Sequence, residues 1–113
     1  LTRGLDQCLF VFTEEEWKNQ EKKFREQSFT RQEARKFNRL YFSGACDALC
    51  DKQGRILIPS YLKEYAGIKT NVIIIGVSDR IEIWSEEKWN QFFKENLSAF
   101  EELAEKIIEP KQP

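Results

Sequence analysis

An internal repeat is the feature that most limits how this chain of 113 residues can fold. Residues 4–17 align with residues 76–89 without a gap, at a constant offset of 72 positions. The leading glycine, two glutamates and the closing tryptophan are identical, and most positions between them match in kind. A repeat of this sort encodes the same structural unit twice. We therefore predict that both windows form a turn, a short β-strand and an N-capped helix.

The first half of the chain carries signals for a strand and two helices. Residues 8–12 are rich in β-forming side chains. Residues 13–16 fit a capping box, which predicts a helix from about residue 14 to about residue 27. Residues 30–33 fit a second capping box. Apolar residues at helical spacing follow it, and Gly44 is expected to end that helix.

The middle of the chain reads as two strands, a short helix and a third strand. Residues 45–50 and 55–58 are expected to pair across a turn at residues 51–54. Residues 60–66 predict a short helix that the next glycine closes. The β-branched run at residues 72–75 is typical of a strand that is buried on both faces.

The second copy of the repeat leads into the last helix. Residues 81–84 predict a strand, and Ser85 is placed to cap a helix that runs to about residue 108, before Pro110. A heptad-like stripe on this helix could cover its own sheet, as amphipathic surface helices usually do, or join subunits. The stripe consists of Phe93, Leu97, Phe100, Ala104 and Ile107.

The turn at residues 51–59 carries the most specific candidate for binding. Asp51 can hydrogen-bond its own backbone, and Gly54 can take a positive φ without steric cost. Arg55 follows directly beside Lys52, and Pro59 ends the strand because it cannot donate to a ladder. A guanidinium held at a turn suits a phosphate or a base edge. An ordinary hairpin with a solvated arginine is the alternative.

Composition excludes several classes of function. The hydrophobic fraction of 41% allows a packed core, and no apolar run is long enough to span a bilayer. Cys8, Cys46 and Cys50 are an odd number, and no secretion leader is recognisable, so we expect reduced, structural thiols that are buried in a cytoplasmic protein. The chain has no histidine, no phosphate-binding glycine loop and no nucleophile with a base partner. We therefore expect neither an enzyme nor a metal or cofactor site.

Charge is unevenly distributed although the net charge is only −1. Residues 18–39 carry eight basic residues against three acidic ones, whereas residues 81–109 carry eight glutamates against three lysines. Such a division can produce head-to-tail contacts between subunits or a polarised field. It is also compatible with two solvated helix faces. The low net charge argues against a protein that binds nucleic acid through bulk basicity.

Six motifs distributed over nearly the whole chain resemble the MraZ family of bacterial transcription factors, within the AbrB-like (SpoVT-AbrB) superfamily. The Asp-x-x-Gly-Arg turn alone is weak, but the turn, the repeat and the intervening helices together are specific. The motifs are Leu-Thr-Arg-Gly-Leu-Asp at 1–6, Phe-Ser-Gly-Ala at 42–45, Asp-Lys-Gln-Gly-Arg-Ile-Leu-Ile-Pro at 51–59, Tyr-Ala-Gly at 65–67, Ile-Gly-Val at 75–77 and Ile-Glu-Ile-Trp at 81–84.

The resemblance implies an α+β fold, a double-split or swapped-hairpin β-barrel built from two AbrB-like repeats with surrounding helices. Residues 1–44 would be the remainder of the first repeat, and residues 45–113 the complete second repeat with its C-terminal helix. The first copy of the repeat lacks a counterpart of the 51–59 turn. We therefore expect that roughly 30 residues precede Leu1 in the intact protein, if the two copies are matched in length.

The resemblance also implies a function. Members of the family form homo-oligomeric rings in the cytoplasm, on the nucleoid, and bind promoter repeats of the division and cell-wall gene cluster, usually as repressors. Arg55 would contact a base or phosphate, while Lys52 and Lys63 would contact phosphates of double-stranded DNA. Asp51, Gly54 and Pro59 would shape the turn. No membrane, small-molecule substrate or cofactor is implied, and the alternative is an oligomeric protein-interaction scaffold that does not bind DNA.

Overall fold

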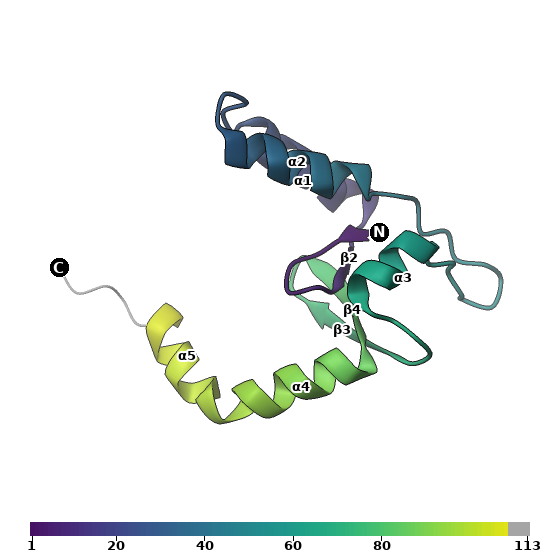
Figure 1. Ribbon diagram of the computed structural model, residues 1–113, viewed down its shortest axis with the longest axis vertical. Helices are drawn as coiled ribbons and strands as arrows, with labels where there is room; N and C mark the ends of the chain where they lie inside the picture. Colours follow the sequence, from purple (N-terminus) through teal and green to yellow (C-terminus); the bar gives the residue numbers. More distant parts are fainter. Residues whose placement is uncertain (109–113) are drawn as a thin grey trace.

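An antiparallel sheet lies at the centre of the computed structural model, which describes residues 1–108 (Figure 1). Its strands are β1 (Thr2–Arg3), β2 (Leu9–Val11), β3 (Val72–Val77) and β4 (Arg80–Ser85). In the described part of the chain they form one four-stranded sheet in the order β1-β2-β4-β3, with every neighbouring pair antiparallel. The fold is therefore of the α+β class, as the resemblance implied.

Helices surround this sheet and extend beyond it (Figure 1). A long connection at residues 44–59 separates the second helix from the third. The helical elements are α1 (Glu14–Arg25), α2 (Gln32–Ser43), α3 (Ser60–Ala66), α4 (Glu86–Asn96), the 3₁₀ turn η1 (Leu97–Ala99) and α5 (Phe100–Ile108).

The two copies of the repeat meet edge to edge through an approximate two-fold axis. β2 pairs with β4 so that Phe10 lies opposite Glu82, which is its own counterpart at the offset of 72. Leu9 corresponds to Ile81 in the repeat but lies opposite Ile83, and Val11 corresponds to Ile83 but lies opposite Ile81. The axis therefore carries each of these two pairs onto the other. Both windows contain the predicted turn, strand and capped helix in the same order. The prediction of a structural repeat is confirmed.

The sheet separates two apolar clusters because side chains alternate along each strand. One cluster is centred on Leu9, Ile83 and Leu62, and it joins the sheet to α3 and to part of the long connection. The other is centred on Phe10 and Trp84 and is mostly aromatic. It joins the sheet to α1, α2 and the start of α4. The three tryptophans belong to this aromatic cluster, as packing residues should.

Three of the predicted helix ends are confirmed, and in each the capping residue lies next to the helix in sequence. Thr13 accepts a hydrogen bond from the Glu16 backbone N–H at 3.1 Å, and Ser85 accepts one from the Lys88 N–H at 3.1 Å. Gly67 closes α3 with a φ of 68°. The second predicted capping box is wrong, since α2 begins one residue later with Arg31 as its N-cap and without a side-chain cap. The Thr30 hydroxyl is bonded instead to Ser28 at 2.7 Å.

The predicted strands at residues 45–50 and 55–58 do not form. Both segments are extended, and alternate side chains at 46, 48, 56 and 58 pack on the first cluster. The opposite side chains are exposed, with Leu49 and Leu57 each 82% accessible. The prediction recognised the alternation that a strand requires, but within residues 1–108 no backbone hydrogen bond joins the two segments. Asp51, in the turn between them, donates its N–H to the Arg55 carbonyl at 2.8 Å. The β3 run is also more exposed than predicted, because Ile74 on this edge strand is 63% accessible.

The last helix is not continuous, contrary to the prediction. Residues 97–99 form a 3₁₀ turn between α4 and α5, and the two helices meet at an angle (Figure 1). The apolar stripe does not cover the sheet: Phe93, Leu97 and Phe100 are 48%, 57% and 69% exposed. The alternative in which this stripe covers its own sheet is therefore wrong, although the start of α4 packs on the sheet through Trp89. Pro110 lies outside the described residues.

Candidate nucleic-acid interface

The turn at residues 51–55 is organised by the carboxylate of Asp51. One oxygen, Oδ1, accepts the backbone N–H groups of Gln53 and Arg55, each at 2.9 Å. The Gly54 N–H donates to the Asp51 carbonyl at 3.0 Å, which closes the turn on the backbone side. Gly54 has a φ of 80°, a conformation that costs a residue with a side chain free energy. The local sequence is therefore sufficient to specify this loop.

Asp51 is held in its ionised form by the same contacts. Its pKa is lowered, mainly by the hydrogen bond from the Arg55 backbone N–H, with the Gln53 N–H and the Arg55 side chain contributing further. Burial acts in the opposite direction. Because an ionised carboxylate repels phosphate, Asp51 can organise this loop but is a poor direct contact for nucleic acid.

The guanidinium of Arg55 is paired and remains accessible. Its Nε donates to Asp51 Oδ2 at 3.2 Å, and its Nη2 donates to the Gln53 side chain. The Arg55 side chain is 72% exposed and lies on the protein surface. A guanidinium has five N–H donors, so these two bonds leave three for a further partner. The ion pair with Asp51 fixes the orientation of the fork while one edge stays open.

The loop is tied to the core on its C-terminal side. Ile56 and Ile58 pack against the first cluster, and Pro59 is the N-cap of α3. Leu62 and Ala66 then anchor α3 completely, since both are inaccessible to solvent. The loop itself projects beyond α3 at the right-hand side of Figure 1. This arrangement presents an internally hydrogen-bonded polar tip on an apolar base.

The predicted lysines lie on the same part of the chain. Lys52 is exposed within the loop, and Lys63 is exposed on α3, one residue after the fully buried Leu62. The Lys63 and Pro59 backbones are joined by a 3.1 Å hydrogen bond that starts the helix. Within residues 1–108 neither ammonium group has an ion-pair partner, and both are accessible to an anion, although the two side chains come from different elements.

The cysteines only partly match the sequence analysis. Cys8 is buried, and its pKa is raised to about 12, chiefly by burial and also by Glu82 and Asp6. Cys46 is half-buried and packs on the first cluster. Cys50 is exposed, so the expectation that it is buried is wrong. Its side chain follows Cys46 and Ala48 at the spacing of the packed set, but it is exposed because the chain leaves the core there to form the loop.

A charged cluster at the centre of the sheet was missed from the sequence. Glu82 is 8% exposed and accepts hydrogen bonds from Arg80 Nε at 2.9 Å and from Trp84 Nε1 at 3.0 Å. The Arg80 guanidinium lies 4.5 Å from the centre of the Phe10 ring. Alternate residues on one strand share a face, so the spacing 80, 82, 84 was the signal that could have revealed it. The polar groups of this cluster bond to one another, so its role is in the packing of the sheet.

Other classes of site find little support in residues 1–108. In this range no group of three or more His, Cys, Asp or Glu is placed to hold a metal ion. None of the described helices has the length and apolarity that crossing a bilayer requires.

Comparison with known proteins identifies the family. A family profile described as "MraZ protein, putative antitoxin-like" matches residues 1–40 and 41–109. The chain belongs to the MraZ family. The chain covers 75–76% of the length of curated MraZ relatives.

Three of these MraZ relatives show how close the similarity is. A transcriptional regulator MraZ of Carboxydothermus hydrogenoformans is 50% identical over 109 residues, which are 96% of this chain and 76% of that protein. One of Heliobacterium modesticaldum is 49% identical over 108 residues, with the same coverage. One of Caldanaerobacter subterraneus subsp. tengcongensis is 51% identical over 107 residues, which are 95% of this chain and 75% of that protein.

Proposed function

We propose that this chain is a sequence-specific DNA-binding transcriptional regulator. It acts as an oligomeric ring on repeated promoter elements of the bacterial division and cell-wall gene cluster, usually as a repressor, in the cytoplasm on the nucleoid. Relatives of about 50% identity over nearly the whole chain carry the name of a transcriptional regulator, which supports this role. The observation that carries the proposal is the accessible, oriented guanidinium of Arg55 on an internally hydrogen-bonded loop.

The architecture proposed with this function is a double-split β-barrel. Residues 1–44 are the remainder of a first AbrB-like repeat, and residues 45–113 are a complete second one. The two-fold axis between β2 and β4 supports this division, because it relates one window of each repeat. The extended segments on either side of the 51–55 loop supply strand-like edges for such a barrel.

The proposed roles divide between shape and contact. Arg55 reads a base edge or holds a phosphate with the donors that Asp51 and Gln53 leave free. Lys52 and Lys63 contact phosphates. Asp51, Gly54 and Pro59 set the shape of the loop and its attachment to α3.

A single loop makes few contacts with DNA, so useful affinity depends on several copies of the loop in one assembly. The net charge of −1 provides no general attraction for phosphate. Linking several loops in one assembly makes each further contact intramolecular, which raises the overall affinity through effective concentration. Repeated promoter elements are the matching arrangement on the DNA side.

The test is a fluorescence-anisotropy titration at increasing salt. The probe is a duplex from the promoter of the gene cluster, compared with a shuffled duplex of equal composition. We expect R55A to weaken binding by roughly 5- to 150-fold if a bidentate base contact worth about 1–3 kcal/mol is lost. A phosphate contact alone should instead reduce the slope of log K against log salt by about 0.9. K18A removes an equal charge from the exposed surface of α1 and is the matched control.

The alternative function is an interaction scaffold without DNA binding, and the exposed apolar stripe of the last helices favours it. Equal affinity of R55A and the wild-type protein would remove Arg55 from the proposal. An assembled wild-type protein that discriminates neither duplex at low salt would favour the scaffold.

A further inference from the structure

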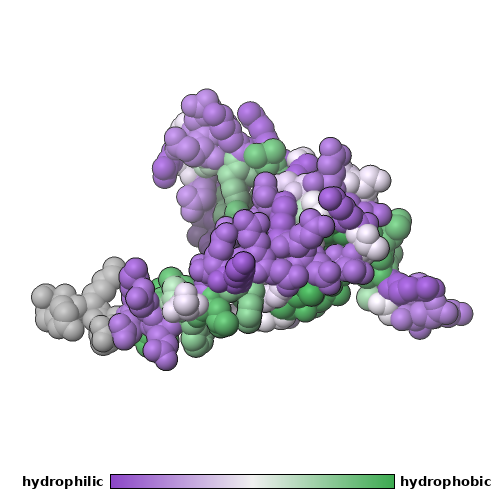
Figure 2. All heavy atoms as spheres, turned by 60° about the horizontal axis from the view of Figure 1, so that its bottom comes forward, coloured by the Kyte–Doolittle hydropathy of each residue, from purple (hydrophilic) through white to green (hydrophobic). Residues whose placement is uncertain are grey.

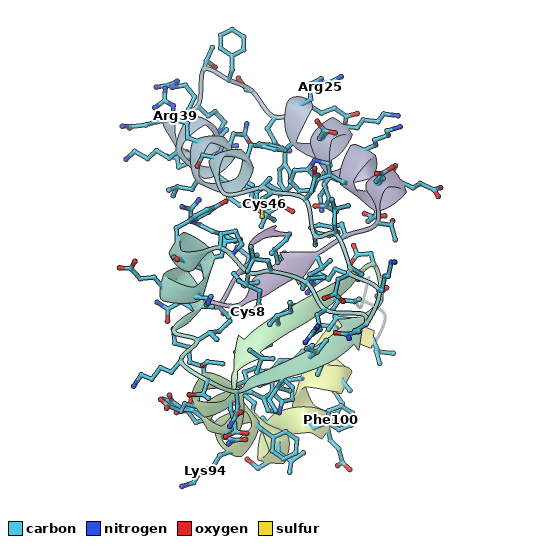
Figure 3. The ribbon with its side chains drawn as sticks, turned by 90° about the vertical axis from the view of Figure 1, so that its right-hand side faces the viewer. Cys8, Arg25, Arg39, Cys46, Lys94 and Phe100 are labelled. Atoms are coloured by element: carbon cyan, nitrogen blue, oxygen red, sulfur yellow. The ribbon has the colours of Figure 1, made fainter. Side chains whose placement is uncertain are left out.

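Two helical surfaces occupy opposite ends of the molecule. We call α1 and α2 with their connection, residues 14–43, the hairpin, and α4, η1 and α5, residues 86–108, the arm. Figure 3 shows Arg25 and Arg39 of the hairpin at one end and Lys94 and Phe100 of the arm at the other. Figure 1 shows the same separation, with the sheet between them.

The arm exposes four residues of the apolar stripe and, next to Ala104, also Leu103. The side chains of Phe93, Leu97, Phe100, Leu103 and Ile107 are between 47% and 81% accessible. Figure 2 shows apolar side chains on the arm surface near its C-terminal end. Single exposed apolar residues are ordinary, but a contiguous series of this kind marks a surface that a partner covers.

Comparison of the two copies of the repeat shows that, within residues 1–108, the arm lacks a covering helix that the hairpin has. The arm is the second-copy counterpart of the hairpin, because α1 and α4 begin at equivalent positions. In the hairpin, α2 covers Trp17 with Tyr41 and Phe42, whose rings lie 5.6 and 5.5 Å away. The equivalent Trp89 has aromatic contacts only from β4 and α4 among the described residues. Among the described residues, the second copy therefore lacks the covering helix that α2 provides in the first copy.

Complementary charge indicates that the hairpin of another copy is the surface that covers the arm. The arm contains six glutamates and three lysines, whereas residues 22–39 of the hairpin contain seven basic residues and two glutamates. Pairing two arms about a two-fold axis would bring like charges together. Pairing an arm with a hairpin brings opposite charges together, which favours encounter and fixes orientation.

The hairpin also offers apolar contact within its basic surface. Leu40 is 61% exposed on α2, and Lys36 lies one helical turn before it on the same face, while the adjacent Arg39 is also exposed. Phe29, at the connection between α1 and α2, is 79% exposed. An amphipathic helix that carries glutamates could pack on Leu40 while its charged side chains meet these cations.

We propose that the arm of one copy docks on the hairpin of the next copy of this chain, with the apolar stripe against Leu40 and Phe29. The inference rests on the proposed ring and specifies the two surfaces that would form it. Such a contact is heterologous, so repeating it produces a closed ring or an open filament. It leaves the 51–55 loop free, since that loop belongs to neither surface.

The test reverses charge on one surface at a time. One variant carries E101K and E105K on the arm, and a second carries K36E and R39E on the hairpin; all four residues are exposed. A matched control carries D47K and E64K, two exposed positions outside both surfaces. Assembly is measured without DNA by sedimentation velocity over a range of concentrations. Circular dichroism verifies that each variant keeps its helices.

Each reversed variant alone should require about tenfold or more higher concentration to assemble, while the control behaves as wild type. An equimolar mixture of the two variants should assemble again, because the lysines introduced on one arm then meet the glutamates introduced on the hairpin of the other variant, while the second type of contact keeps its wild-type charges. Assembly of the hairpin variant at wild-type concentration would overturn the inference, and so would a mixture that fails to reassemble. DNA binding is measured separately, so its failure with an intact assembly would refute only the proposed function.

Discussion

Glu82 should be among the polar residues whose replacement is most costly to this fold. Its carboxylate accepts from the buried Trp84 indole at 3.0 Å and pairs with Arg80 Nη2 at 2.8 Å. E82L leaves the indole N–H without its partner, which costs about 1–3 kcal/mol. It also removes the ion pair between Glu82 and Arg80, but Arg80 keeps its ion pair with Asp79 and is 28% exposed, which limits that loss. We expect the free energy of unfolding to fall by about 2–4 kcal/mol in total.

E82Q separates the two contributions. A glutamine oxygen can still accept from Trp84, so only the charge interaction with Arg80 is lost, and about half of the effect should remain. When Arg80 has already been replaced by alanine, adding E82Q should change the free energy of unfolding very little, because the charge interaction is already absent.

The assay is urea unfolding followed by tryptophan fluorescence. With a slope of about 2 kcal/mol per molar urea, E82L should lower the midpoint by about 1–2 M. E64L replaces an exposed glutamate of α3 and should stay within about 0.5 kcal/mol of wild type. If E82L and E64L unfold at the same midpoint, the buried carboxylate does not stabilise the fold and the reasoning is refuted.

Two further predictions use the same unfolding assay. T13A and S85A each remove a side-chain N-cap, so each should lower the free energy of unfolding by about 1 kcal/mol. T30A should have little effect, because Thr30 caps no helix. Equal losses in all three variants would contradict this assignment of caps. Burial raises the pKa of Cys8 and of Tyr41 to about 12, so the folded state retains these protons longer than the unfolded state, and stability should fall as pH rises from 9 to 12. C8A should reduce the steepness of that fall, and an unchanged pH profile would show that the thiol does not contribute.

The sequence predicted features whose cause is local. Thr13 and Ser85 cap helices through bonds to the third following residue, and Asp51 and Gly54 determine a loop within five residues. The repeat predicted that two similar units exist, and the structure adds that they pair through Phe10 and Glu82. Nothing in either window indicated which edges would meet, because that choice depends on the rest of the core.

The features that sequence patterns missed depend on tertiary contact. Residues 55–58 alternate like a strand, yet a strand also needs a hydrogen-bonding partner along its edge. The last helix has an uninterrupted apolar stripe, yet its backbone tightens into a 3₁₀ turn at residues 97–99. Cys50 lies at the same spacing as a packed residue, but it is exposed because the chain leaves the core there.

The pairing of β2 with β4 has a consequence for synthesis on the ribosome. At about 5–20 residues per second, the 72 residues between Phe10 and its partner take roughly 4–14 s to emerge. During that interval, the β2 edge and its apolar side chains have only the short β1 strand beside them. A nascent chain in this state is a natural client for a chaperone at the tunnel exit, and slow codons between the two copies of the repeat would lengthen its exposure.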